Sequence, residues 1–186
     1  MSRGRIDIDS PASPADGIIL ASAMTIADGL RLEFERETRA TRRYLERLPG
    51  DKLAWRPHAK SFTAGDLASH IVECVRWTEV IFGGNEFDVD PATFAPYQAP
   101  SSDALLAAFD ADVVRGTRAL AAVGDEAVTR PWRMKIKGTV RFERPKAMVF
   151  RDFTLSHLIH HRGQLSVYLR LLDVPVPGAY GPTADE

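Results

Sequence analysis

Histidines close to the C-terminal end of the chain carry its clearest chemical signal. The segment His157-Leu-Ile-His160-His161-Arg-Gly-Gln164 contains three imidazoles, and His157 and His161 are four residues apart. At about 100° per residue, four steps along a helix return to within about 40° of the starting direction, so both rings would point the same way. Two imidazoles on one helical face are suited to binding a divalent metal ion. This segment is therefore expected to supply some of the ligands of a metal site.

The spacing by itself leaves the partner of His157 open. Three helical steps place His160 about 60° away on the other side, so His157 pairs with either His160 or His161. Two imidazoles on a buried face are costly to desolvate in the charged form, and a divalent cation removes that cost by binding their lone pairs. We therefore favour a metal site over a pair of plain core histidines.

A third ligand has to come from another segment, and His70 in Ala64-Gly-Asp-Leu-Ala-Ser-His70-Ile-Val-Glu73 is the best remaining candidate. A single histidine on an apolar face is more often a core residue than a ligand, so His70 gains weight only from the histidine pair. Cys74 follows it by four residues, but a lone buried cysteine usually behaves as a small apolar side chain. The sequence thus predicts a three-histidine site, which keeps a coordination position open for chemistry.

Two polar residues beside these histidines are candidate catalytic residues. Glu73 follows His70 by three residues and could act as a general base on a metal-bound water, although a solvated surface carboxylate is the commoner outcome. Gln164 follows His161 by three residues and could support that ligand with its amide. We name Glu73 and Gln164 as the residues that assist the chemistry.

Composition excludes several other classes of protein. The 186 residues form one expected domain, 1–186, with 45% hydrophobic residues and with residues 1–15 as a loose N-terminal arm. A net charge of −1 argues against nucleic-acid binding, and no apolar run approaches the roughly 20 residues of a membrane span. The single cysteine, Cys74, cannot form an intrachain disulfide. We expect a soluble, cytoplasmic protein.

Helical periodicity occurs in four segments, approximately 23–48, 64–82, 101–124 and 145–172. Between the last two, residues 132–142 alternate apolar and charged side chains around a glycine, which predicts a short hairpin or an extended excursion. The expected fold class is all-α, a four-helix bundle with this excursion between the third and fourth helices. In the second helix, Thr63 and Asp66 have the spacing of a capping box.

The candidate ligands lie on the apolar stripes that should face the core. The stripe of the second helix consists of Leu67, His70, Cys74, Trp77 and Ile81. The stripe of the fourth helix consists of Phe150, Thr154, His157, His161, Leu165, Tyr168 and Leu172. Beside them, Arg162 is expected to pair with a carboxylate on a neighbouring helix, and Gly163 in mid-helix suggests close helix packing.

Taken together, these motifs resemble the DinB/YfiT-like family of metalloenzymes. The likeness covers most of the chain and rests on four runs: Leu48-Pro-Gly-Asp-Lys-Leu-Ala-Trp55-Arg-Pro-His58, Ser61-Phe-Thr-Ala-Gly-Asp-Leu-Ala-Ser-His70, the histidine segment 157–164, and Val174-Pro-Val-Pro-Gly-Ala-Tyr-Gly181. The resemblance implies a four-helix bundle in which one histidine of the second helix and an HxxxH pair bind a divalent metal.

Carried onto this chain, the resemblance implies that His70, His157 and His161 are the metal ligands, and it favours His161 over His160. It also implies a homodimer, and relatives include transferases and isomerases that use a low-molecular-weight thiol, bacillithiol or mycothiol. Imidazole ligands suit zinc, nickel or iron, so the identity of the metal stays open.

The chain offers no nucleophile elbow and no glycine-rich phosphate loop, so a metal is the only chemical resource that the sequence indicates. Such a metal could lower the pKa of a bound water to about 7, or bind a thiol as its thiolate. We expect a metal-dependent enzyme acting on a small molecule, either a thiol-dependent transferase or a hydrolase. The alternative is a non-catalytic, stress-related dimeric bundle that binds metal. A pocket beside the metal, lined by side chains such as Trp77 and Tyr168, would favour the enzyme.

Overall fold

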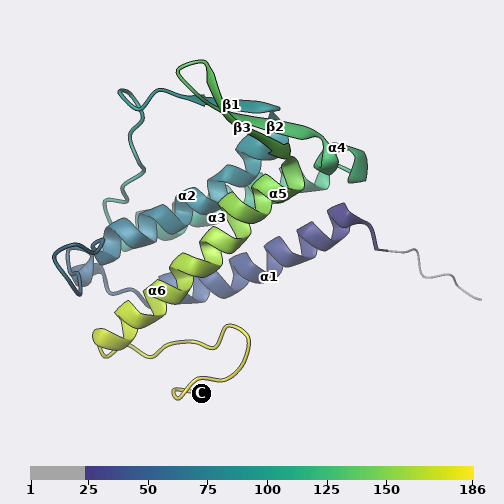
Figure 1. Ribbon diagram of the computed structural model, residues 1–186. Helices are drawn as coiled ribbons and strands as arrows, with labels where there is room; N and C mark the ends of the chain where they lie inside the picture. The colour runs from purple at the N-terminus through teal and green to yellow at the C-terminus, as the bar shows by residue number, and fades with distance from the viewer. Residues whose placement is uncertain (1–23) are drawn as a thin grey trace, which may run out of the picture.

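Four long helical segments lie side by side in the computed structural model, which describes residues 24–186 (Figure 1). They are α1 (Ile26–Glu46), α2 (Ala64–Gly83), α3 (Ser102–Ala121) and a C-terminal path that ends in α6 (His157–Leu171). Contacts join α1 to α3, α3 to α2, α2 to α6, and α6 back to α1. The helices therefore surround one core. The arm predicted at 1–15 lies outside the described residues.

Helix ends are specified locally. Thr25 caps α1 and Thr63 caps α2, each in a capping box with the aspartate three residues later, as predicted for Thr63 and Asp66. Ser101 caps α3 by accepting a hydrogen bond from the backbone N–H of Ala104. Beyond α1, a short 3-10 turn, η1 (Gly50–Lys52), leads into the loop that returns to α2.

The C-terminal helical path, predicted as one helix over 145–172, consists of three pieces. They are α5 (Lys146–Phe150), a π-helical turn η2 (Arg151–Ser156) and α6. A π turn contains more residues than an α turn, so it shifts the faces that precede and follow it relative to each other. Gly163 is exposed, and a Cβ added there would meet nothing within 4 Å. The expectation of close helix packing at Gly163 is therefore wrong.

A small sheet covers one end of the helices, so the all-α prediction is wrong. Its strands are β1 (Glu86–Val89), β2 (Pro131–Ile136) and β3 (Thr139–Pro145), in the order β1-β2-β3. β2 and β3 form the hairpin anticipated at 132–142, and its turn places Lys137 and Gly138 at positive φ. β1 pairs with β2 in parallel, although α3 and the short α4 (Asp125–Thr129) lie between the two strands in the sequence.

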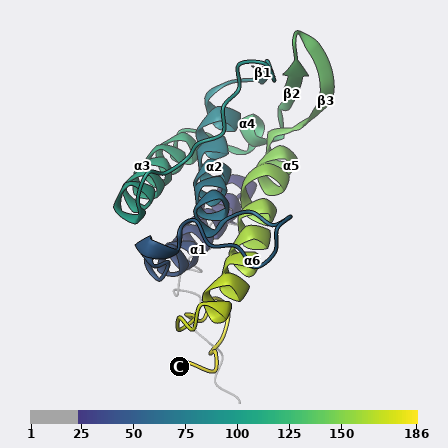
Figure 2. The same ribbon diagram turned by 90° about the vertical axis from the view of Figure 1, so that its left-hand side faces the viewer.

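Aromatic side chains join the sheet to the helices. Trp132 of β2 is completely buried, with its ring centroid 6.4 Å from that of Trp77 on α2. Phe150 packs between Phe34 of α1 and Phe82 of α2, at centroid distances of 6.0 and 5.2 Å. Figure 2 shows the sheet at the end of α2 and α5, away from the C-terminal end of α6. Within residues 24–186, no helix combines the length and apolarity needed to cross a membrane.

Candidate metal centre

Three imidazoles from two helices meet at one place. His70 comes from α2, and His157 and His161 come from α6. The ring centroid of His70 lies 4.9 Å from that of His157 and 4.6 Å from that of His161, and the last two are 4.6 Å apart. The Nε2 atoms of His70 and His157 are separated by 3.3 Å. Hence α2 and α6 bring together residues that are 87 positions apart in the chain.

This separation fits two ligands of one metal ion. Imidazole nitrogens about 2.0–2.1 Å from a tetrahedral zinc ion lie about 3.4 Å from each other. The observed 3.3 Å between the Nε2 atoms of His70 and His157 is close to that value. Both rings are only partly buried, so an ion at this point would also be reachable from outside the helices.

The outer nitrogens of these rings are held by hydrogen-bond acceptors. His70 Nδ1 lies 3.1 Å from Glu73 Oε2, and His161 Nδ1 lies 2.7 Å from Gln164 Oε1. His157 has a hydrogen bond with the backbone of Phe153. Carboxylate and amide oxygens only accept here, so the Nδ1 atoms carry the protons and the Nε2 lone pairs of His70 and His161 are available to a metal.

Glu73 connects the cluster to the loop that follows β1. Its Oε1 accepts a hydrogen bond of 2.7 Å from the backbone N–H of Tyr97, while Oε2 accepts from His70. Burial would raise the pKa of Glu73, but these two hydrogen bonds, together with the charges of His70 and Arg76, lower the pKa on balance. Both oxygens are thus engaged, an arrangement suited to orienting His70. The general-base role expected for Glu73 stays a prediction.

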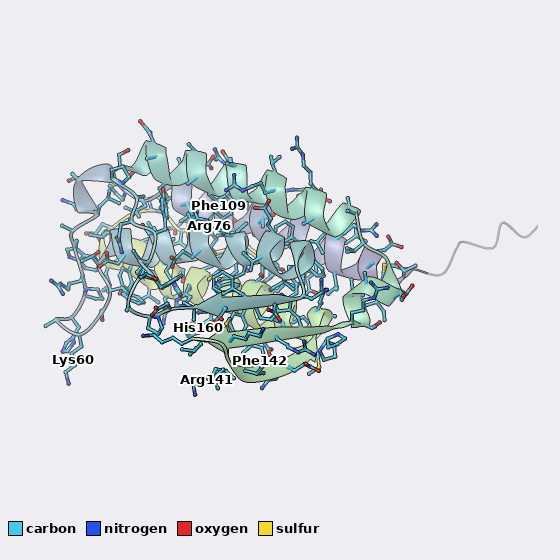
Figure 3. All side chains as sticks on the ribbon, turned by 90° about the horizontal axis from the view of Figure 1, so that it is seen from above. Lys60, Arg76, Phe109, Arg141, Phe142 and His160 are labelled. Atoms are coloured by element: carbon cyan, nitrogen blue, oxygen red, sulfur yellow. The ribbon has the colours of Figure 1, made fainter. Side chains whose placement is uncertain are left out.

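Gln164 lies between two histidines. Its Oε1 faces His161, and its Nε2 lies 3.1 Å from the Nε2 of His160. His160, labelled in Figure 3, is exposed, and its ring centroid lies 4.9 Å from that of His161. By contrast His161 is buried, and burial lowers the pKa of His161 to about 4, so its ring is neutral at pH 7.

Cys74 also lies in this region. Together with His70 and His157 it forms a group whose potential ligand atoms are all within 4.8 Å of one another. The residue is buried, and this burial raises the pKa of the Cys74 thiol to about 12. We expected Cys74 to be a plain core residue, but its position makes it a competitor of His161 for the third ligand. The four-residue spacing from His70 was the sequence signal for this proximity.

A cavity of about 670 Å³, which we call the pocket, opens beside His70, whereas His157 and His161 do not line it. Trp77 lines it as expected, whereas Tyr168 does not and instead donates a hydrogen bond to the carbonyl of Phe62 on its wall. The sequence did not lead us to predict the part of the pocket wall that the loop before α3 contributes. The lining residues are Phe62, Asp66, His70, Glu73, Arg76, Trp77, Val80, Phe87, Phe94, Ala95, Pro96, Tyr97 and Gln98.

Comparisons with known proteins agree with this architecture. A sequence model of the DinB superfamily matches residues 33–165. A crystal structure of a DinB-like protein from Bacillus cereus ATCC 10987 superposes with a TM-score of 0.66 at 22% identity, covering 84% of this chain and 99% of that one. For the DinB-like protein YjoA from Bacillus subtilis, the TM-score is 0.63 at 18% identity, with 81% and 97% covered. At these identities the likeness concerns the fold. No curated protein matches the sequence.

Proposed function

The chain belongs to the DinB superfamily, and on that basis we propose that it is a divalent-metal-dependent enzyme acting on a small molecule. The observation that carries the proposal is the convergence of His70, His157 and His161, together with the open pocket that His70 lines. A closed structural site would use every coordination position and would have no reason to adjoin a cavity.

Each residue has a distinct part in this proposal. His70, His157 and His161 would hold zinc, nickel or iron, and Glu73 and Gln164 would keep His70 and His161 in the orientation that ligation requires. A bound divalent metal supplies Lewis acidity, which makes a nucleophile available at neutral pH. The largely apolar pocket would exclude water from the reacting groups.

The reaction that we propose is transfer to or from a low-molecular-weight thiol, with hydrolysis as the second possibility. The chain's own cysteine supports an external thiol, because Cys74 is buried and its pKa is raised to about 12. Such a thiol is a poor nucleophile at pH 7. The homodimer implied by the family resemblance stays a prediction.

The alternative function is a non-catalytic, stress-related dimeric module that binds metal. The pocket beside His70 favours the enzyme, because a purely structural metal needs no access for a second molecule.

Metal content is the first test. We expect about one equivalent of metal in protein purified without an immobilised-metal column, measured by elemental mass spectrometry. The double variant His157→Ala, His161→Ala should lose it, because two imidazole ligands are removed. The matched control is His160→Ala, which removes an exposed histidine of the same helix and should retain the metal.

Two outcomes would contradict the proposal. One is the absence of metal from the wild-type protein even after incubation with zinc, nickel and iron(II). The other is a metal-loaded protein that shows neither thiol transfer nor hydrolysis across a panel of electrophiles and thiols, which would leave the non-catalytic module.

A further inference from the structure

Arg76 differs from the other residues that line the pocket. It is the only lysine or arginine among them. Its Nε donates to the Asp112 carboxylate at 3.2 Å, and its guanidinium lies 5.1 Å from the ring centroid of Tyr97. Within residues 24–186, its Nη1 and Nη2 groups donate no hydrogen bond to the protein. Figure 3 shows Arg76 on α2, on the side that faces α3.

The carboxylate behind Arg76 has a second partner. Asp112 is almost completely buried, and Arg115 on the same helix also pairs with it. Arg115 has a further contact with Glu79 at the surface, 3.2 Å away. Asp112 therefore fixes the orientation of Arg76 through Nε only. The remaining N–H groups of the guanidinium form a planar fork that can bind two acceptor oxygens.

Acidic residues on the pocket wall do not occupy this fork. Both oxygens of Glu73 already accept hydrogen bonds from His70 and Tyr97. Asp66 is ten residues before Arg76 on α2, which corresponds to about 15 Å along the helix axis. The Nη groups of Arg76 are therefore positively charged hydrogen-bond donors that the pocket wall offers to an anionic ligand.

Aromatic side chains form most of the remaining wall. Trp77 meets Phe87 edge to face at a centroid distance of 5.1 Å, and the aromatic lining residues are Phe62, Trp77, Phe87, Phe94 and Tyr97. Such walls contact a flat ring over both faces and edges, whereas a flexible chain would lose more conformational entropy on binding. The pocket's volume of about 670 Å³ is ample for a bicyclic ligand.

We propose that the pocket binds a flat aromatic molecule with one carboxylate-like group, and that Arg76 holds this group through its Nη atoms. The proposal deepens the function proposed above. It rests on that function because the metal-binding histidines would define the end of the pocket at which the ligand reacts. His70 precedes Arg76 by six residues, about 9 Å along the helix. Both side chains line the pocket, so a ligand held by Arg76 can extend toward His70.

Calorimetric titration with three probes tests this assignment. Naphthalene-2-sulfonate carries the ring and the anion but is a weak metal ligand, and 2-(methylsulfonyl)naphthalene is its neutral counterpart. Decane-1-sulfonate carries the same anion and the same number of carbons without a ring. The metal-loaded protein should bind the aromatic sulfonate about tenfold or more tightly than either other probe, because the charged hydrogen bonds and the ring contacts act together.

Variants identify the residue responsible. In Arg76→Gln the preference for the anion over its neutral counterpart should vanish, while Arg76→Lys should retain part of it. The matched control is Arg115→Gln, which removes the other arginine from Asp112 but does not line the pocket, and it should keep the full preference. Asp112 keeps one arginine in either variant, and circular-dichroism melts establish that each is folded.

Three results would overturn the assignment: equal binding of the aromatic sulfonate and its neutral counterpart, an anion preference that survives in Arg76→Gln, or equal binding of the decane chain. The same titrations on chelator-treated protein separate this proposal from the metal-dependent function. If the protein binds no metal but shows the Arg76-dependent preference, the result supports this ligand class and contradicts the metal-dependent function. If the protein binds metal but shows no such preference, the result contradicts this ligand class and leaves the metal-dependent function in place.

Discussion

At the residue scale, the hydrogen bonds behind the imidazoles matter as much as the imidazoles themselves. His70 and His161 each donate Nδ1–H to a side-chain acceptor three residues later in the same helix. This spacing places donor and acceptor on neighbouring positions of one helical face. Each helix therefore supplies a ligand together with the residue that orients it.

Replacing Glu73 tests this orienting role. Glu73→Gln retains the shape but has one acceptor oxygen for two donors, His70 Nδ1 and the backbone N–H of Tyr97. We expect zinc affinity to fall about tenfold or more, measured by competition with a chromophoric chelator. Glu79→Gln is the control, because Glu79 is an exposed glutamate of the same helix. An unchanged affinity in Glu73→Gln would argue against the orienting role.

The metal affinities of Cys74→Ala and His161→Ala show which of these two residues is the third ligand. If His161 is the ligand, Cys74→Ala should keep its metal affinity and His161→Ala should lose at least tenfold. The cobalt(II)-substituted protein then lacks an intense sulfur-to-metal charge-transfer band. A strong band in the wild-type protein that disappears in Cys74→Ala would instead make the group His70, Cys74 and His157 the metal site.

At the element scale, the approach of three helices depends on one glycine. A Cβ built on Gly116 of α3 would lie 2.8 Å from Cζ of Phe34 on α1 and 3.0 Å from Cβ of Thr78 on α2. Both neighbours are buried, so neither can move away freely. The absence of a side chain at Gly116 allows these helices to pack closely.

Gly116→Val should accordingly destabilise the protein by about 1–3 kcal/mol, because the added methyl groups overpack the contact with Phe34 and Thr78. Urea unfolding followed by circular dichroism measures the change. Gly163→Ala is the matched control in α6, where an added Cβ meets nothing within 4 Å. It should be neutral or stabilising by up to about 1 kcal/mol. Equal stability of Gly116→Val and the wild type would contradict the packing argument.

At the scale of the whole molecule, a buried ion pair joins the first helix, the last helix and the C-terminal tail. Arg162 of α6 donates to Glu37 of α1 at 2.8 Å, as the sequence led us to expect for a carboxylate on a neighbouring helix. The hydroxyl of Tyr180 in the tail donates to the same carboxylate at 2.7 Å. Arg162 directly follows His161, so this cluster also fixes the helix that carries two of the candidate ligands.

The pH dependence of stability should report on this cluster. Burial raises the pKa of Glu37, but hydrogen bonds from Tyr180 and Arg162 outweigh it, and the pKa lies below its ordinary 4.5. Because the folded-state pKa is depressed, the stabilisation is present above pH 4.5 and is lost as pH falls below that value.

Glu37→Gln should therefore be less stable than the wild type at pH 7, by about 3 kcal/mol or more, because Arg162 stays buried without its charged partner. The difference should shrink as the pH is lowered from 5 to 3, where the wild-type carboxylate becomes protonated. Thermal melts of both proteins across this range measure it, and a difference that is constant with pH would contradict the assignment.

Local sequence patterns were enough to predict the helices and the histidine pair. Capping residues and apolar periodicity specify the long helices, and the four-residue spacing places His157 and His161 on one face, because these patterns depend only on neighbours within one or two turns. The hairpin at 132–142 was also predictable from its alternation and its glycine turn.

Features that depend on contacts between distant parts of the chain could not be predicted from these local patterns. β1 has only four residues and is defined by parallel pairing with β2, which no local pattern encodes. The pocket wall around Tyr97 and the approach of Cys74 to His157 arise in the same way, from helices and loops that meet across the core. The helical period predicts which side chains share a face, but the packing of α2 against α6 decides which of those faces meet.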